Sequence, residues 1–305
     1  MILLLSEELC GTANTLMEIF KKRNIPAFRF NLDLFNEYKF IWEDGEFEIT
    51  DPIGRKIYSR YITQVVCYKA LISNYNIYSF EHDYDDGKWL KSCLNNLYFN
   101  IIKYAEEKNK LKLWQPLEER FPKVWQMRLA KRYFKVPSFS IFWGYQLSPK
   151  EVISKPLTSR PLDDGSLYFA QKVNRADLST DYPWFVQDIA EGDRDATVVY
   201  INGKIHCYQF ATKRGNLTDW RVTQGTDDNK WEKWETNRAF EQKIDEFMKA
   251  AGLKYGRLDF IIGGSEPQFL EVNPAGQFGW LDDDEFTLHN EVVDAILDES
   301  STIRL

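Results

Sequence analysis

Several familiar signatures are missing from this sequence, and each absence removes a class of function. The four cysteines (Cys10, Cys67, Cys93 and Cys207) are far apart and form no Cys-x-x-Cys pair. This excludes a Cys-rich zinc site and a disulfide framework, and it predicts reduced thiols in a cytoplasmic protein. No Gly-x-x-x-x-Gly-Lys-Ser/Thr loop is present, and no Gly-x-Gly-x-x-Gly follows the first expected strand. A P-loop and a dinucleotide fingerprint are therefore excluded.

Long apolar runs and an excess of basic residues are also lacking. The apolar start, Ile2–Leu5, is far shorter than the roughly 20 residues of a spanning helix, and it lacks the pattern of a signal peptide. We expect no membrane partner. Lys and Arg number 39 against 46 Asp and Glu, for a net charge of −7, so we expect no nucleic-acid partner despite 21 Phe, 16 Tyr and 10 Trp.

The composition that remains, 44% hydrophobic and 28% charged, is that of an ordinary globular chain. The hydrophobic periodicity of the first third predicts an α/β unit with a strand–helix–strand opening, an Asp-Gly hairpin and a long helix. The expected elements are strand Ile2–Leu5, helix Thr12–Arg23, strand Ala27–Phe30, hairpin Phe40–Ile49 and helix Trp89–Glu107.

After residue 112 the pattern changes to short strands with a few helices, which predicts an antiparallel, mixed α/β (α+β) body. The expected helices are Lys123–Phe134, Phe240–Ala251 and Leu288–Leu297. The expected strands are Glu151–Leu157, Leu167–Val173, Trp184–Ile189, Thr197–Ile201, Ile205–Phe210, Leu258–Ile262 and Gln268–Val272. The acidic run Asp282–Glu285 is expected to begin the last helix, where negative charge suits the helix dipole.

The strongest chemical pattern lies in the last two expected strands. Glu271 and Asn273 are two residues apart, so their side chains leave the same face of the strand. If Asp259 on the preceding strand points to that face, two carboxylates and an amide converge, and these hard ligands suit Mg²⁺. The alternative is a hairpin with polar residues on its solvent face.

Two lysines are candidates for binding an anion. Lys155 lies inside an apolar strand, where an ammonium is unusual unless it meets a negative partner. Lys123 lies at the start of a helix. Each alone could equally be a surface lysine with a buried stem, and a phosphate group would give both a partner.

The block Tyr255–Phe260 followed by Phe269–Leu281, which reads Phe-Leu-Glu-Val-Asn-Pro-Ala-Gly-Gln-Phe-Gly-Trp-Leu, together with Asp219-Trp220-Arg221 upstream, resembles the ATP-grasp ligases. Within them the chain is most similar to the graspetide (microviridin-type) maturases of ribosomal peptides. The resemblance implies an ATP-grasp fold with a pre-ATP-grasp α/β domain at 1–112. It also implies a central subdomain at 113–187 and a C-terminal subdomain with the metal site at 188–305.

The resemblance assigns site residues position by position. It places Mg²⁺ on Asp259, Glu271 and Asn273, the phosphates of ATP on Lys123 and Lys155, adenine at Gln187, Asp188 and Ile189, and the ribose at Glu191. One position departs from the pattern, because many relatives have arginine where this chain has Thr197. Arg194 is close by in sequence.

The implied activity is macrocyclisation of a ribosomal precursor peptide, made of a leader and an acidic core. ATP would activate Asp or Glu side chains as acyl phosphates, Ser/Thr hydroxyls or Lys would attack to form esters or amides, and ADP and phosphate would be released. Arg257 would stabilise the acyl-phosphate oxygen, and Arg221 would hold the substrate carboxylate through a bidentate pair. The alternative for Arg221 is a surface arginine stacked on Trp220 or Trp231. A homodimer is expected from the same resemblance.

Two other functions stay open at this point. A carboxylate–amine ligase for a free amino acid or small acid would share every ATP and metal residue, and only the Asp219–Arg221 and Gly276–Trp280 motifs favour a peptide maturase. A nucleotide-binding scaffold without turnover is disfavoured by the intact set of Asp259, Glu271 and Asn273.

Overall fold

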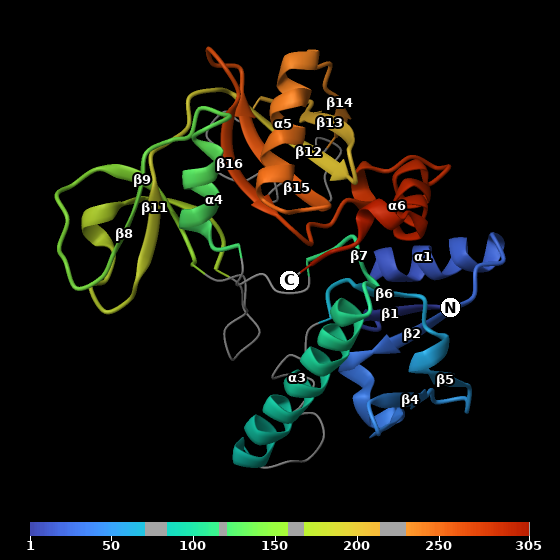
Figure 1. The fold of residues 1–305 in the computed structure, drawn as a ribbon. Coiled ribbons are helices and arrows are strands. Elements are labelled where there is room, and N and C mark those ends of the chain that lie inside the picture. Colours follow the sequence, from blue (N-terminus) through green and yellow to red (C-terminus); the bar gives the residue numbers. More distant parts are fainter. Residues whose placement is uncertain (71–83, 116–120, 158–167, 214–229, 305) are drawn as a thin grey trace.

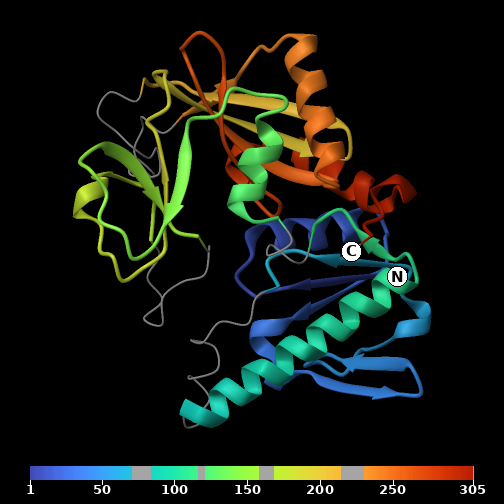
Figure 2. The same ribbon diagram turned by 60° about the vertical axis from the view of Figure 1, so that its left-hand side comes forward.

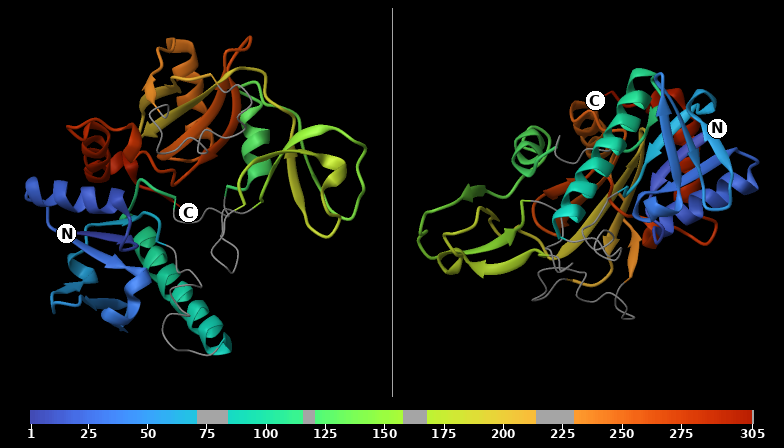
Figure 3. Two further views of the ribbon diagram at one scale, coloured as in Figure 1. Left: turned by 180° about the vertical axis from the view of Figure 1, so that it is seen from behind. Right: turned by 90° about the horizontal axis from the view of Figure 1, so that it is seen from below.

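The computed structural model describes residues 1–70, 84–115, 121–157, 168–213 and 230–304. Figure 1 shows three regions that each contain a sheet: an N-terminal region in blue and teal, a small central sheet in yellow-green, and a C-terminal sheet in gold and orange. Seen from behind, the N-terminal region and the central sheet lie on either side of the C-terminal sheet (Figure 3, left). No helix in the described ranges is both long and apolar enough to cross a membrane.

The N-terminal region is built on a parallel sheet with strand order β2-β1-β6-β7. Its strands are β1 (Ile2–Ser6), β2 (Ala27–Asn31), β6 (Gln64–Cys67) and β7 (Leu111–Lys112). All five residues of β1 are buried because helices cover both faces, as expected for a parallel sheet. Helix α1 (Gly11–Lys22) packs on one face, and α3 (Tyr84–Glu107) lies across the other (Figure 2). A three-stranded sheet joins the α3 side: β3 (Lys39–Glu43), β4 (Glu46–Thr50) and β5 (Lys56–Tyr58).

The last described residues return to the edge of this N-terminal sheet. The Ile303 amide donates to the Leu111 carbonyl at 2.9 Å, and the Leu113 amide donates to the Ser301 carbonyl at 3.0 Å. The buried Lys112 donates from Nζ to Thr302 Oγ1 at 2.8 Å, across 190 positions of sequence. The β7 edge is therefore closed by chain from the far end of the sequence.

The central sheet is antiparallel and has a small core of Phe142, Val152 and Val186. Its strands, in the order β10-β9-β11-β8, are β8 (Phe139–Phe142), β9 (Glu151–Lys155), β10 (Gln171–Asn174) and β11 (Trp184–Gln187). Helix α4 (Lys123–Ala130) precedes this sheet in sequence, but its buried residues pack with those of the C-terminal sheet. The three domain boundaries given by the resemblance stay a prediction.

The C-terminal sheet is antiparallel, in the order β14-β13-β12-β15-β16. Its strands are β12 (Arg194–Ile201), β13 (Lys204–Phe210), β14 (Trp231–Lys233), β15 (Tyr255–Ile262) and β16 (Gln268–Asn273). Helix α5 (Arg238–Ala250) covers one face. Helix α6 (Thr287–Leu297) packs on the residues of the other face near the start of β15 and also against α1. Beyond α6 that second face carries polar side chains, and the candidate site lies there.

Most of the predicted elements are confirmed, with ends shifted by one to five residues. The hairpin turns at Asp44 and Gly45, which have φ of 49° and 82°, as an Asp-Gly turn requires. The helix expected over Lys123–Phe134 is α-helical only to Ala130. The strands β5, β6, β7, β8 and β14 were not predicted, and short 3-10 helices occur at Leu32–Glu37, Ser59–Tyr61, Arg175–Asp177, Gly279–Leu281 and Glu299–Ser301.

The acidic run was expected to begin the last helix, but α6 starts only at Thr287, and the run lies just before it. Asp282 accepts the amides of Leu288 and His289 at 2.7 and 3.1 Å, and Asp283 accepts the amide of Thr287 at 2.9 Å. These carboxylates satisfy amides of the first turn that have no partner within the helix.

Candidate functional site

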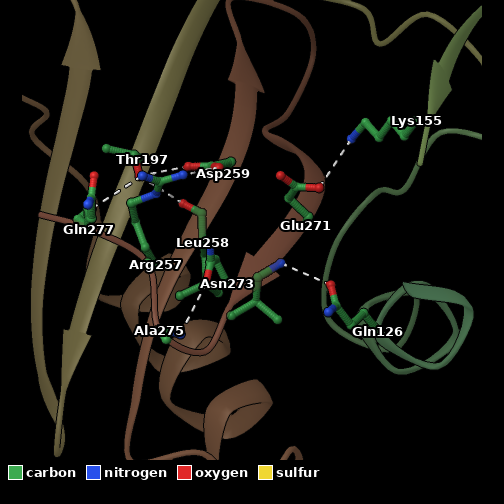
Figure 4. A network of polar contacts seen from close by, with 12 residues as sticks. Gln126, Lys155, Thr197, Arg257, Leu258, Asp259, Glu271, Asn273, Ala275 and Gln277 are labelled. Atoms are coloured by element: carbon green, nitrogen blue, oxygen red, sulfur yellow. Dashed lines mark hydrogen bonds and ion pairs between the residues drawn. The ribbon is translucent and has the colours of Figure 1, made fainter. Parts of the chain in front are cut away.

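The site is built on one ladder between β15 and β16. Asp259 stands opposite Glu271, and Arg257 stands opposite Asn273, so all four side chains leave the same face. A bulge follows, because the register shifts between Asp259 and Phe260. Figure 4 shows Asp259 turned toward β12 and Glu271 turned toward the central sheet. The ladder thus places Asp259, Glu271 and Asn273 on one face, which was the condition set by the sequence, and their joint binding of a metal stays a prediction.

Asp259 is held within its own sheet. Thr197, its cross-strand neighbour on β12, donates from Oγ1 to Asp259 Oδ1 at 2.9 Å, and Arg257 donates from Nη2 to Oδ2 at 3.0 Å. Arg257 is only 8% exposed. Burial by itself lowers the pKa of its guanidinium. The negative charge and the hydrogen bond of Asp259 more than offset this, so the pKa of Arg257 lies above its ordinary value. Arg257 is a buried permanent cation.

Glu271 is held by other elements. Lys123, the first residue of α4, donates from Nζ to Glu271 Oε2 at 3.1 Å. Lys155, the last residue of β9, has its Nζ 3.7 Å from the same oxygen and is 7% exposed. The two lysines picked out in the sequence therefore meet at one predicted metal ligand. With Arg257, three cationic side chains lie beside the two carboxylates Asp259 and Glu271, and such a cluster of donors suits an anionic ligand.

The donor set fits a magnesium ion shared with a ligand. Asn273 Oδ1 accepts the amide of Ala275 at 3.1 Å, which orients the carboxamide. Among the described residues, no group of three or more His, Cys, Asp or Glu is placed to hold a metal. Two carboxylates and an amide oxygen would leave coordination positions for phosphate oxygens and water, which is how Mg²⁺ is commonly bound.

The residues expected at adenine form the connection from the central sheet to the C-terminal sheet. Gln187 ends β11 and is 1% exposed, with its side-chain amide donating to Met127 Sδ at 3.6 Å. The Asp188 amide donates to the Ser138 carbonyl at 2.7 Å, and its carboxylate pairs with Lys150 at 2.6 Å. The side chain of Ile189 is exposed. These residues connect β11 of the central sheet to β12 of the C-terminal sheet, and their contact with a nucleobase stays a prediction.

Glu191 lies on the same connection and is exposed. Lys135 Nζ donates to Glu191 Oε2 at 2.8 Å, and this hydrogen bond and charge lower the pKa of the carboxyl. Gln268 Nε2 lies 3.5 Å from the same oxygen. A bound ribose would therefore have to compete with, or add to, the Lys135 contact.

Arg221 and Thr197 are the two positions that the sequence marked on the substrate side. Arg221 lies outside the described residues, as do Asp219 and Trp220. Thr197, where relatives have arginine, hydrogen-bonds Asp259. Arg194 does not replace that arginine, because it lies three residues before Thr197 on the same strand and so leaves the opposite face.

The segment after β16 supplies contacts that the sequence did not predict. The Gln277 carbonyl accepts from Arg257 Nη1 at 3.2 Å (Figure 4), and the Arg257 Cζ lies 5.2 Å from the centre of the Trp280 ring. Gln126 of α4 accepts the Val272 amide at 3.2 Å and ties that helix to β16. The Gly276–Trp280 motif was noted because it resembles that of peptide maturases. Its sequence did not predict that it contacts Arg257.

Solved structures of similar fold exist for the whole chain. A RiPP-associated ATP-grasp ligase of Chryseobacterium gregarium, in complex with ADP and a leader and core peptide, matches with a TM-score of 0.82 at 20% identity, covering 100% of this chain and 99% of that one. The macrocyclase MdnC of Microcystis aeruginosa MRC, bound with the precursor peptide MdnA, matches with a TM-score of 0.75 at 17% identity over 97% and 99%.

The ATP-grasp ligase PsnB, complexed with a phosphomimetic variant of a minimal precursor, Mg and ADP, matches with a TM-score of 0.71 at 15% identity over 98% of both chains. No family model matches the sequence, and no curated protein matches it either. The chain thus has the ATP-grasp fold over its full length, as the resemblance in its motifs implied.

Proposed function

We propose that this protein is an ATP-dependent, ADP-forming ligase that joins side chains within a ribosomally made precursor peptide. The observation that carries the proposal is the meeting of Lys123 and Lys155 at Glu271, opposite Asp259 in one ladder. Such a cluster of cations beside hard oxygen ligands suits the polyphosphate of ATP. The similar structures, which hold ADP and precursor peptides, support both the nucleotide and the class of substrate.

The two lysines would exchange Glu271 for phosphate oxygens when ATP binds. Phosphoryl transfer needs positioning and neutralisation of charge more than covalent help, so ammonium groups placed at the phosphates lower its barrier. Mg²⁺ would be held by Asp259, Glu271 and Asn273, and when bound it would neutralise charge on the phosphates. Gln187, Asp188 and Ile189 are our candidates for contacting adenine, and Glu191 for the ribose.

The reaction would run in two steps. An Asp or Glu carboxylate of the peptide attacks the γ-phosphorus, the bond to ADP breaks, and an acyl phosphate forms. A Ser or Thr hydroxyl (ester) or a Lys amine (amide) then attacks the acyl carbon, phosphate leaves, and the proton of the nucleophile passes to phosphate or solvent. Arg257, buried beside Asp259, is our candidate for stabilising the negative oxygen of the reacting carboxyl.

The peptide substrate separates this proposal from its main alternative, a carboxylate–amine ligase for a free amino acid or small acid. Both would use the same lysines, carboxylates and Arg257. The Gly276–Trp280 motif, which contacts Arg257, is the described feature that resembles peptide maturases. Two further features of the proposal, Arg221 as the group that holds the substrate carboxylate and a homodimer, rest on the sequence.

The test is intact-mass spectrometry of an acidic Ser/Thr/Lys-containing peptide with its leader, incubated with the protein and MgATP. We expect the loss of one water for each bond formed, with one ADP released in step. A parallel incubation with a non-hydrolysable ATP analogue should leave the mass unchanged. Mild base then hydrolyses esters but leaves amides intact.

The outcomes separate the candidate functions. If ADP forms only with free amino acids or small acids, the substrate is a small molecule and the proposed peptide substrate is wrong. ATP that binds but is never turned over would contradict a ligase and favour a nucleotide-binding scaffold. A protein that binds no MgATP at all would show that the cluster around Glu271 is only structural.

A further inference from the structure

The backbone of Gly276 and Gln277 lies directly against Arg257. The Gln277 carbonyl accepts from Arg257 Nη1 at 3.2 Å. A Cβ added at Gly276 would lie 2.7 Å from Arg257 Cβ, which is closer than side chains approach, so only glycine allows this contact. Arg257 Nε is buried and has no acceptor among the described residues. The orientation of the guanidinium therefore depends on Asp259 and on this stretch of backbone.

Two tyrosine hydroxyls converge on the carbonyl just before that contact. Tyr255 Oη donates to the Gly276 carbonyl at 2.6 Å, and Tyr68 Oη lies 3.5 Å from the same oxygen. Burial raises the pKa of both hydroxyls above the ordinary value for tyrosine, so both stay protonated and able to donate. The Gly276 carbonyl is thus fixed from two sides.

The two tyrosines come from different regions of the molecule. Tyr255 begins β15, two residues before Arg257, while Tyr68 directly follows β6 in the N-terminal region. Trp114 packs between them, with ring centres 4.6 Å from Tyr68 and 5.3 Å from Tyr255, and all three side chains are fully buried. Through Tyr68 and Trp114 the N-terminal region packs against Tyr255 and contacts the backbone segment that binds Arg257.

We propose that Tyr255 and Tyr68 are positioning residues for Arg257, which they orient by fixing the Gly276 carbonyl and with it the Gln277 carbonyl. The proposal deepens the proposed function, on which it rests for the role of Arg257. A peptide unit is planar, so fixing the Gly276 carbonyl also fixes the amide and Cα of Gln277, and only the two dihedral angles of Gln277 then separate that point from the carbonyl that contacts Arg257. Catalysis by a positioned charge is sensitive to small displacements, and loss of either hydroxyl leaves the carbonyl less well held.

The test compares Tyr255→Phe and Tyr68→Phe with Tyr200→Phe as the matched control. Tyr200 is also a buried tyrosine of the same sheet, and its hydroxyl donates to Asp245 at 2.9 Å, away from the Arg257 network. Each of the three variants loses one tyrosine hydroxyl that makes a hydrogen bond. Hydrogen exchange of the amides in 274–281 is followed by mass spectrometry, and kcat and the KM for ATP are measured with the peptide substrate.

We expect Tyr255→Phe to speed exchange in 274–281 and to lower kcat by about 10- to 100-fold, with the KM for ATP nearly unchanged. Tyr68→Phe should act in the same direction with a smaller effect, because its contact is longer. Tyr200→Phe should leave exchange in 274–281 and kcat as in the wild type. In an Arg257→Ala background, Tyr255→Phe should have no further effect on kcat, which a merely structural role would not predict.

Equal exchange in 274–281 for Tyr255→Phe and Tyr200→Phe would overturn the proposal, whatever the activity. If Tyr255→Phe does not fold, the same comparison with Tyr68→Phe decides. A wild-type protein that modifies no peptide contradicts the proposed function instead, and the exchange data still decide whether the tyrosines hold this segment.

Discussion

The two carboxylates of the site stand opposite each other in one ladder but are held in different ways. Asp259 is bound by Thr197 and Arg257, both from the same sheet. Glu271 is bound by Lys123 and Lys155, which come from α4 and from the central sheet. One half of the site is therefore fixed when the C-terminal sheet forms, whereas the other half exists only when three elements come together.

We infer from this difference that the two halves have different roles in the reaction. A preorganised charge within a rigid sheet suits the transition state, because it needs no reorganisation during the reaction. Charges that come from separate elements suit a ligand that arrives and leaves, because those elements can close on it and open again. We therefore expect the Arg257 half to act on the reacting carboxyl and the Glu271 half to hold nucleotide.

Removing either carboxylate should give the largest effect and show the contrast most clearly. Asp259→Asn and Glu271→Gln should both abolish product formation while leaving the protein folded. Their stabilities should differ: Asp259→Asn leaves a buried guanidinium without its counter-ion and should cost about 3 kcal/mol, while Glu271→Gln should cost about 1 kcal/mol or less. Urea unfolding and the peptide mass assay measure the two properties.

Wild-type turnover in either variant would remove that carboxylate from the metal site. An equal loss of stability in the two variants would contradict the comparison. It would mean that the two carboxylates contribute equally to the free energy of unfolding, although their surroundings differ.

Lys155→Met and Lys123→Met should have the next largest effect. Each keeps an apolar stem but removes an ammonium, and a charge-assisted hydrogen bond is worth roughly 1.5–3 kcal/mol, so MgATP affinity should fall about 10- to 100-fold. Lys155 should matter more, because it is more buried than Lys123 and therefore less screened. Calorimetric titration with MgATP checks this.

The matched control is Lys249→Met on α5, whose ammonium pairs with Asp245 on the surface. Its MgATP affinity should equal that of the wild type. An unchanged affinity in Lys155→Met would assign that lysine a structural role beside Glu271.

Thr197→Val should give the smallest effect. It removes one hydrogen bond to Asp259 while Arg257 still holds that carboxylate, so we expect a loss of about 1 kcal/mol of stability and a few-fold fall in kcat. Thr197→Ser keeps the hydroxyl and should restore activity. A loss of activity as complete as in Asp259→Asn would mean that Thr197 itself contacts the substrate, in the place of the arginine of relatives.

The sequence predicted the sheet half of the site better than the other half, for a physical reason. Alternation along a strand shows which residues share a face, so Arg257 could be grouped with Asp259, and Glu271 with Asn273, whereas the shared face of the two pairs became known only from the register. No periodicity connects Lys123 and Lys155 to Glu271, and the resemblance assigned these lysines to the phosphates of ATP without predicting their contact with Glu271. The roles of Tyr68, Gln277 and Trp280 around Arg257 depend on tertiary packing, which local pattern does not contain.

A ribosome that makes this chain finishes β7 long before it finishes the residues that close the edge of β7. Lys112 and Thr302 are 190 positions apart, which at typical rates of synthesis is about 10 to 40 seconds of translation. During that time the edge of the N-terminal sheet is open to pairing with other chains. Deleting residues 301–303 would leave the same edge open in the finished protein.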